Sequence, residues 1–307
     1  MDHKDNWDKS TLDEDVVVIE NHPRARASTF RRLRLQGMLY VLTCVTTFSA
    51  GVVGWQPMIM GFDDDIASTF SLNWPRGFAY MVAVMAVLTA HEAGHFIVAW
   101  RYRIPATLPF FLPVPILLTG TLGAVIGMEG SRANRRQLFD IAFAGPIAGL
   151  IVAVPVMAIG MFFGTSSDTS PFALSPLAQW LLSIIKPEAS GGIEPNALFM
   201  AGWVGLLVTG LNMIPVSQLD GGHISYAVFG RMSKWVARSV LACAVVAIVV
   251  FELYNWIAMV VIVMLMGTDH PPIREDGQRL GVARTILGVF ALLIPIITFM
   301  PEPLVIN

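Results

Sequence analysis

The stretch TAHEAGHFIVAW, from Thr89 to Trp100, continues an apolar run that begins GFAYMVAVMAVL at Gly77. A run of roughly 20 apolar residues is long enough to cross a bilayer as a helix. Two histidines and a glutamate within it are costly, because one charged group at the centre of such a helix costs about 2.5–3.5 kcal/mol. Ionisable groups at this depth therefore indicate a functional site.

The composition around this stretch is that of a membrane protein. Of the 307 residues, 55% are hydrophobic and only 14% are charged, and the mean hydropathy is +0.64. The net charge of -2 gives no reason to expect a nucleic-acid partner. We predict an all-α polytopic protein embedded in the lipid bilayer, and the sequence predicts no oligomeric state.

Apolar windows of about 20 residues predict about six transmembrane helices. They cover residues 35–54, 77–100, 138–164, 197–215, 236–267 and 282–300. Glu252, Tyr254 and Asn255 interrupt the fifth window, which forms either one long tilted helix or, as we favour, two short ones. Residues 171–186 are too short to span and are predicted to lie in the outer interface as an amphipathic helix.

Arginine and lysine in the short loops set the expected orientation. Several arginines precede the first window, whereas the next connection carries three aspartates at 63–65. We therefore predict a polar cytosolic tail over residues 1–34 and a single membrane-embedded domain over 35–307. The tail resembles neither a secretory signal nor an organellar transit peptide, which favours a prokaryotic inner membrane.

The segment between the second and third windows, residues 104–128, is apolar but rich in proline and glycine. Backbone that is not helical survives at membrane depth only where protein or a water-filled cavity surrounds it. We predict a re-entrant loop or small β-hairpin packed against the bundle. The alternative is a kinked spanning helix, which would reverse the orientation of every later helix.

The motif HEAGH at 91–95 has the spacing of a zinc site. His91 and His95 are four residues apart and share one helix face, while Glu92 can contact a water on the same metal ion. The alternative is a set of buried polar groups bonded to other helices. A catalytic zinc ion has three protein ligands and one open position, so a third ligand must come from elsewhere.

Asp220 is the third ligand that we predict, for one Zn²⁺ per chain. It follows an apolar helix that Pro215 breaks, and Gly221 and Gly222 allow another backbone to approach closely. Two other histidines, His223 and His270, have suitable chemistry and remain alternatives at this stage. Two acids near the basic loop, Glu129 and Asp140, are expected to be surface charges.

With these residues identified, the chain resembles the site-2 protease family of intramembrane zinc metalloproteases. The likeness rests on HEAGH, on LFDIAFAGPIAG at 138–149 and on NMIPVSQLDGG at 212–222, and it covers a core over 77–272. The segments GTLGAVI and DHPP are most similar to the cyanobacterial and plastid-type branch. The resemblance implies a zinc ion held by His91, His95 and Asp220, with Glu92 as the catalytic glutamate. Many bacterial members carry a PDZ domain in a loop, but no loop between the predicted spans is long enough to house one, so we expect none here.

The expected activity is hydrolysis of peptide bonds in or near transmembrane helices of substrate proteins. Glu92 would accept a proton from water and pass it to the leaving amine. Asn212, expected about two helical turns before Asp220 on the same buried element, would donate a hydrogen bond to the oxyanion; a structural hydrogen bond between helices is the alternative. Residues 119–125 would offer a strand edge to an unwound substrate.

Two other classes of protein fit part of the sequence. A transporter or metal-handling membrane protein would use buried histidine and aspartate as transient ion sites, and it would often show related halves. A non-catalytic relative would bind transmembrane helices without cutting them, although it would have no need of Glu92. A cleavage assay separates both classes from a protease.

Overall fold

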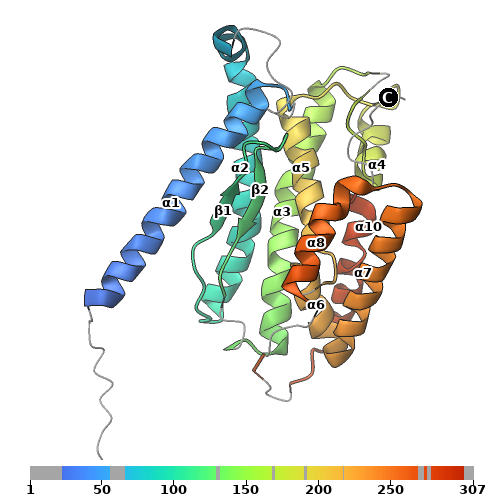
Figure 1. The fold of residues 1–307 in the computed structure, drawn as a ribbon. Coiled ribbons are helices and arrows are strands. Elements are labelled where there is room, and N and C mark those ends of the chain that lie inside the picture. Colours follow the sequence, from blue (N-terminus) through green and yellow to red (C-terminus); the bar gives the residue numbers. More distant parts are fainter. Residues whose placement is uncertain are drawn as a thin grey trace, which may run out of the picture.

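The computed structural model describes residues 23–55, 66–128, 132–167, 170–189, 192–216, 218–268, 273–274 and 278–300, and forms a bundle of helices with a small sheet (Figure 1). The elements are α1 (Pro23–Val52), α2 (Ile66–Arg101), β1 (Phe110–Pro113), β2 (Thr121–Val125), α3 (Arg135–Phe163), α4 (Pro176–Ile185), α5 (Ala197–Asn212), α6 (Asp220–Phe229), η3 (Gly230–Met232), α7 (Ser233–Val250), η4 (Tyr254–Trp256), α8 (Ile257–Met266), α9 (Val282–Ala291) and α10 (Ile294–Thr298). The predicted helical class is confirmed.

Four helical segments are long and apolar enough to cross a membrane by length and composition: 31–52, 67–101, 135–163 and 220–250. The first three match the first three predicted windows. Within the fourth, the turn η3 separates α6 from α7, with Gly230 at a φ of 58°. The predicted window 236–267 divides into α7 and α8, so the two-helix alternative holds.

The fourth predicted window, 197–215, gives only the 16-residue helix α5, which ends at Asn212. A proline disfavours helical backbone at the residue that precedes it, so Pro215 stops α5 close to Asn212. Figure 1 shows α5 in the upper middle of the bundle and α6 below it, nearer the opposite end. The two short helices α5 and α6, with the break between them, therefore together extend from one end of the bundle toward the other.

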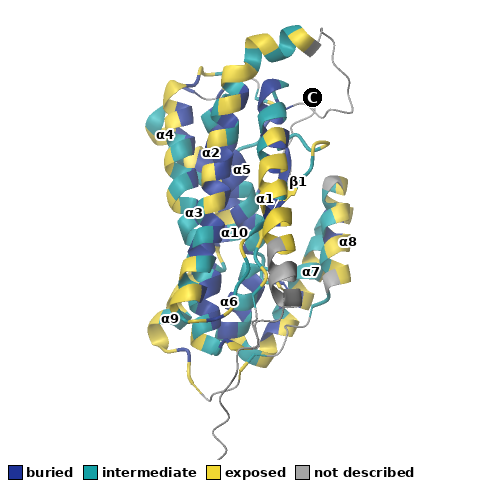
Figure 2. Ribbon diagram, turned by 90° about the vertical axis from the view of Figure 1, so that its left-hand side faces the viewer, coloured by how far each residue is buried: buried dark blue, intermediate teal, exposed yellow. Residues whose placement is uncertain are grey.

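The centre of the bundle is formed by α2, α3 and α5, where buried residues gather (Figure 2). Trp203, Phe199 and Tyr80 are among the largest fully buried side chains. Small residues bring the backbones together: a Cβ on Gly202 would lie 2.3 Å from the Cβ of Met157. Such close approach is typical of helices packed in a membrane.

Residues 104–128 form a hairpin, and the kinked spanning helix is therefore wrong. Strands β1 and β2 pair antiparallel, with Phe110 opposite Val125 and Phe111 opposite Ala124. The hairpin lies against α1, since Gln36 donates from Nε2 to the carbonyl of Leu108 at 2.7 Å. Proline lacks the N–H that a helix needs, and a short hairpin leaves most of these prolines outside its strands.

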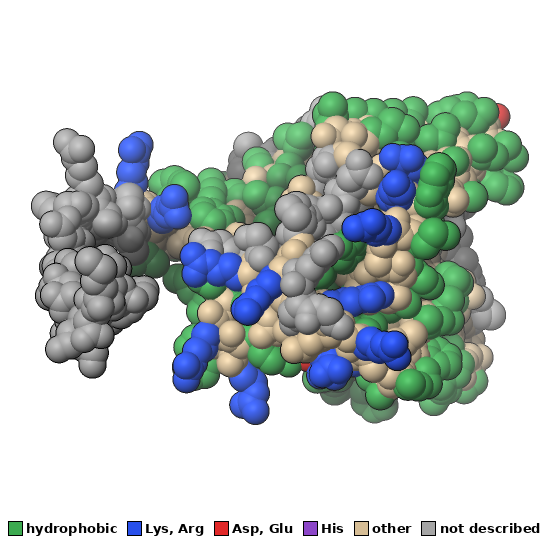
Figure 3. All heavy atoms as spheres, turned by 90° about the horizontal axis from the view of Figure 1, so that it is seen from below, with side chains coloured by type: hydrophobic (Ala, Val, Ile, Leu, Met, Phe, Trp, Pro, Cys, Tyr) green, Lys and Arg blue, Asp and Glu red, His purple; other side chains and the backbone are tan. Residues whose placement is uncertain are grey.

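One end of the bundle is basic. Figure 3 shows lysine and arginine side chains gathered on the face formed by the start of α1, the end of α2 and the starts of α3, α7 and α9. Exposed members of this face are Arg31, Arg32, Arg34, Arg101, Arg103, Arg132, Arg136, Arg231, Lys234, Arg238, Arg274 and Arg279. The aspartates at 63–65 lie outside the described residues.

Candidate metal centre

The structure brings His91, His95 and Asp220 together in the interior, although Asp220 is 129 residues from His91 in sequence. Oδ2 of Asp220 lies 3.2 Å from Nε2 of His91 and 3.3 Å from Nε2 of His95. The histidines are only 3% and 5% exposed. One ligating atom from each residue lies within 4.8 Å of the others, so the group can hold a metal ion.

The donor set and its spacing fit zinc. Two donors about 2.0–2.1 Å from a tetrahedral zinc ion lie about 3.3 Å apart, which agrees with both histidine–aspartate distances. Two imidazoles and one carboxylate also form a known catalytic ligand set that leaves one position for water. Two helices therefore supply a ligand set of the right chemistry at short range.

A hydrogen bond from α3 orients His95. Its Nδ1 lies 2.8 Å from the carbonyl of Ile141. An N–H at Nδ1 donates to this carbonyl, which leaves Nε2 with a free lone pair toward Asp220. Ligating histidines commonly have such a partner on their second nitrogen.

Two glycines of α3 make room for the imidazoles. A Cβ on Gly145 would lie 2.0 Å from Nε2 of His95, and one on Gly149 would lie 3.0 Å from Nδ1 of His91. The glycines are four residues apart and so share one face of α3, as the histidines share one face of α2. The motif AGPIAG thus forms a smooth surface opposite the histidines.

Asp220 is the first residue of α6, where the helix dipole favours a carboxylate. Close packing fixes this end of α6, since a Cβ on Gly221 would lie 2.0 Å from the carbonyl oxygen of Met213. The expectation that Asn212 and Asp220 share one element is wrong, because Asn212 ends α5 and residues 213–219 separate the two helices. Pro215 within this connection prevents a continuous helix.

Asn212 nevertheless reaches the same site. Its Nδ2 lies 3.4 Å from Nε2 of His91, the nitrogen that faces Asp220. A metal ion on this nitrogen would occupy its lone pair, so the amide of Asn212 would need another acceptor nearby. The position suits a donor to an oxygen bound beside the metal.

Glu92 follows His91 on α2 and is 5% exposed. It interacts electrostatically with both histidines and with Asp220. A buried carboxylate beside a metal site is placed to exchange protons with water there. The structure thus places Glu92 with the three side chains that could hold a metal ion, two of which belong to the same motif.

The other ligand candidates are not part of this group. His223 lies on α6 one turn after Asp220, and among the described residues the metal-binding group contains only His91, His95 and Asp220. His270 and Glu129 lie outside the described residues. Asp220 is thus the described residue with the geometry of a third ligand.

Comparison with known proteins agrees with this arrangement. The profile described as peptidase family M50 matches residues 79–254, which include the HEAGH motif and Asp220. The chain belongs to peptidase family M50. Among curated members, this M50 chain is 29% identical over 229 residues to a protein of Arabidopsis thaliana named "Probable zinc metalloprotease EGY2, chloroplastic", covering 71% of the chain and 40% of the relative.

A rice relative, "Probable zinc metalloprotease EGY3, chloroplastic" from Oryza sativa subsp. indica, is 28% identical over 287 residues, covering 85% of this chain and 47% of that protein. The chain thus spans less than half the length of these relatives. Among solved structures, "Site-2 Protease from Methanocaldococcus jannaschii" has a TM-score of 0.37 and 18% identity, covering 75% of this chain and 84% of that one. The predicted family resemblance, including its plastid-type branch, is confirmed by the curated matches.

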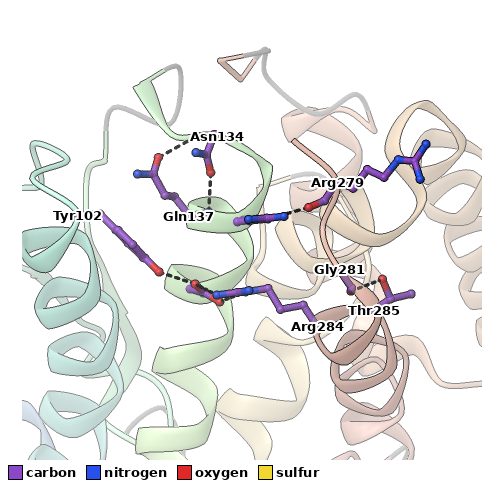
Figure 4. Close-up of polar contacts among 9 residues, drawn as sticks. Tyr102, Asn134, Gln137, Arg279, Gly281, Arg284 and Thr285 are labelled. Atoms are coloured by element: carbon purple, nitrogen blue, oxygen red, sulfur yellow. Dashed lines mark hydrogen bonds and ion pairs between the residues drawn. The ribbon is translucent and has the colours of Figure 1, made fainter. Parts of the chain in front are cut away.

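The expectation that Asp140 is a surface charge is wrong, because this side chain is half-buried and bonded to two partners. Arg284 donates from Nε to Oδ1 at 2.8 Å and from Nη2 to Oδ2 at 2.9 Å, and the hydroxyl of Tyr102 donates to Oδ2 at 2.5 Å (Figure 4). The hydrogen bond to Asp140 raises the pKa of the Tyr102 hydroxyl, which therefore stays protonated as a donor. An aspartate near the start of an apolar helix is a sign in the sequence of a buried polar contact, but the sequence does not identify its partners because they are distant along the chain.

Proposed function

We propose that this chain is an intramembrane zinc metalloprotease that hydrolyses peptide bonds within or near the transmembrane helices of membrane proteins. One observation carries the proposal: His91 and His95 of α2 and Asp220 of α6 converge beside Glu92 inside an apolar helical bundle. Membership in peptidase family M50 supports the same activity. Burying several ionisable side chains in an apolar bundle costs free energy, and chemistry on a substrate that is itself in the membrane explains why the chain bears this cost.

We assign the ligand role to His91, His95 and Asp220, for one zinc ion per chain. Zinc bound there would polarise the scissile carbonyl and lower the pKa of its water. Glu92 would accept the proton from that water and deliver it to the leaving amine. Asn212 would donate from its amide to the developing oxyanion, a role supported by its position beside His91.

The substrate must be unwound, because a carbonyl inside a helix is already hydrogen-bonded. We propose that the hairpin gives the unwound segment new backbone partners along the edge of β2. Gly123 of β2 packs toward Val208 of α5, the helix that carries Asn212 four residues later, which supports this placement. Substrates with helix-breaking residues near the cleavage site should be preferred.

We further propose one membrane-embedded domain over residues 35–307, with about six crossing segments and a cytosolic tail over 1–34. The basic end of the bundle supports a cytosolic location for the start of α1. In this scheme α5 and α9 with α10 complete the crossings although each is short. The prokaryotic inner membrane remains a prediction, and the relatives named above are chloroplast proteins.

The decisive experiment is the variant Glu92→Gln in the purified full chain, with a transmembrane helix as substrate. We expect loss of cleavage with zinc retained, because Gln keeps the shape of Glu but cannot accept a proton. Glu252→Gln is the matched control, since Glu252 is exposed in the turn between α7 and η4. Cleavage by Glu92→Gln at the wild-type rate would refute the assignment.

The same assay tests the two other classes of function. A wild-type chain that holds zinc and binds the helix without cutting it would be a non-catalytic binder. A chain that moves zinc across a vesicle membrane and cuts nothing would be a metal transporter. Chelation of the metal should abolish cleavage, and added Zn²⁺ should restore it.

A further inference from the structure

Outside the metal group, three polar side chains meet at the basic end of the bundle, where Tyr102 and Arg284 converge on the carboxylate of Asp140 (Figure 4). Tyr102 follows α2, Asp140 belongs to α3 and Arg284 to α9, so one carboxylate joins three elements. We propose that this Tyr102–Asp140–Arg284 cluster holds the metal ligands of α2 and α6 in register. Its members are positioning residues, and the inference rests on the proposed metal site.

On the α2 side, the cluster and the metal site share one helix face. Tyr102 lies seven residues after His95, which is close to two full helical turns. The N–H of Tyr102 still bonds to the carbonyl of Val98 at 3.1 Å, so the helical geometry reaches this point. His95 and Tyr102 therefore face α3 together.

Both residues bond to consecutive positions of α3. The hydroxyl of Tyr102 bonds to Asp140, and Nδ1 of His95 bonds to the carbonyl of the next residue, Ile141. Two contacts separated along α2 prevent this helix from rotating or sliding against α3. A rotation of α2 would swing both ligating imidazoles away from Asp220.

On the other side, Arg284 places α9 against α6. Gly288 lies one turn after Arg284, and a Cβ there would stand 2.6 Å from Cγ2 of Val228 and 3.5 Å from Cγ2 of Ile224, both on α6. Ile224 lies one turn after Asp220 and so faces the same way. The ion pair that holds α9 to Asp140 thus also holds the wall against which the third-ligand helix packs.

The ion pair between Arg284 and Asp140 acts more by fixing the positions of the two helices than by the attraction between its charges. The side chain of Arg284 is 38% exposed and that of Asp140 is 19% exposed, so solvent weakens their attraction. A bidentate guanidinium–carboxylate pair nevertheless fixes direction as well as distance. Metal sites need ligand distances held to within about 0.2 Å. Loss of a partner that hydrogen-bonds a ligand directly typically lowers metal affinity about 10–100-fold, so this more remote cluster should act at the lower end of that range.

The test is zinc affinity, measured by competition with a chelator in the purified full chain. We expect Asp140→Asn and Arg284→Gln to bind zinc about tenfold more weakly, the lower end of the range for direct partners of ligands, with helical content unchanged by circular dichroism. The absorption spectrum of the Co²⁺-loaded chain should change as well, because it reports the arrangement of the ligands. Arg279→Gln is the matched control, since its side chain points away from the cluster in Figure 4.

Two milder variants keep the test open if Asp140→Asn does not fold. Tyr102→Phe removes one hydrogen bond, and Arg284→Lys keeps the charge but not the bidentate geometry. We expect both to lie between wild type and Arg284→Gln in zinc affinity. Wild-type affinity and Co²⁺ spectra in all folded cluster variants would overturn this inference alone, whereas a wild-type chain that binds no metal would overturn the proposed function with it.

Discussion

Gly145 of α3 lies directly against the imidazole of His95, since a Cβ built on this glycine would stand 2.0 Å from Nε2. The same nitrogen faces Asp220 at 3.3 Å. The His95 ring cannot retreat freely, because its Nδ1 is bonded to the carbonyl of Ile141, also on α3. The absence of a side chain at Gly145 of α3 thus leaves the space that the His95 ring occupies beside Asp220.

Gly145→Ala is therefore expected to weaken zinc binding at least about tenfold, because the new methyl group displaces the ligating ring. Gly37→Ala is the matched control on α1, where a Cβ meets nothing within 4 Å and alanine favours the helix. Zinc affinity of both variants, measured by chelator competition, checks the prediction. Equal affinities would show that His95 is not the ligand or that α3 can move.

The ligand set predicts which histidines matter for metal content. His91→Gln and Asp220→Asn should each reduce zinc well below one ion per chain, because each removes one of three protein ligands. His223→Gln should retain zinc, since His223 lies outside the ligand group. Metal analysis after dialysis distinguishes them, and full zinc occupancy in Asp220→Asn would remove Asp220 from the site.

Asn212→Ala separates a catalytic role from a structural one. If the amide stabilises the oxyanion, kcat should fall about 100- to 1000-fold with zinc content unchanged. Asn73→Ala is the control for an amide on α2 whose Nδ2 bonds within its own helix, to the carbonyl of Thr69. A purely structural hydrogen bond would instead lower the melting temperature and leave kcat within a few-fold of wild type.

Gly120 tests the packing of the hairpin on α1. At its φ of 76°, a Cβ would lie 2.6 Å from the carbonyl oxygen of Thr46, a backbone atom that cannot turn aside. Gly267 has a similar φ of 81°, with a ψ of 168°, but nothing lies within 4 Å of its Cβ position, so Gly267→Ala carries only the backbone strain of about 1–3 kcal/mol.

Gly120→Ala should therefore unfold at a lower temperature than Gly267→Ala. If the hairpin also receives substrate, Gly120→Ala should raise KM for a transmembrane substrate. Equal melting temperatures would mean that the hairpin is not held against α1.

The long apolar helices α1, α2 and α3 follow from sequence because lipid imposes a local rule: a long apolar segment must satisfy its own backbone hydrogen bonds. Proline and glycine in residues 104–128 likewise exclude a regular helix and leave a hairpin as one of few choices. The sequence predicts an apolar window that continues to Pro215, whereas α5 ends at Asn212, because a helix end inside the bundle depends on its neighbours. Here the close approach of Gly221 to Met213 decides where α6 restarts.

The sequence by itself determined that His91 and His95 share one helix face, with Glu92 beside them, because a four-residue spacing acts within about one helical turn. Only the tertiary structure decided that Asp220 and Asn212 reach that face from separate helices, and that Gly145 and the carbonyl of Ile141 hold His95 in place. It also turned Asp140 from an expected surface charge into the partner of Tyr102 and Arg284. Such pairings depend on how helices pack at close range, which hydropathy and spacing along one chain do not encode.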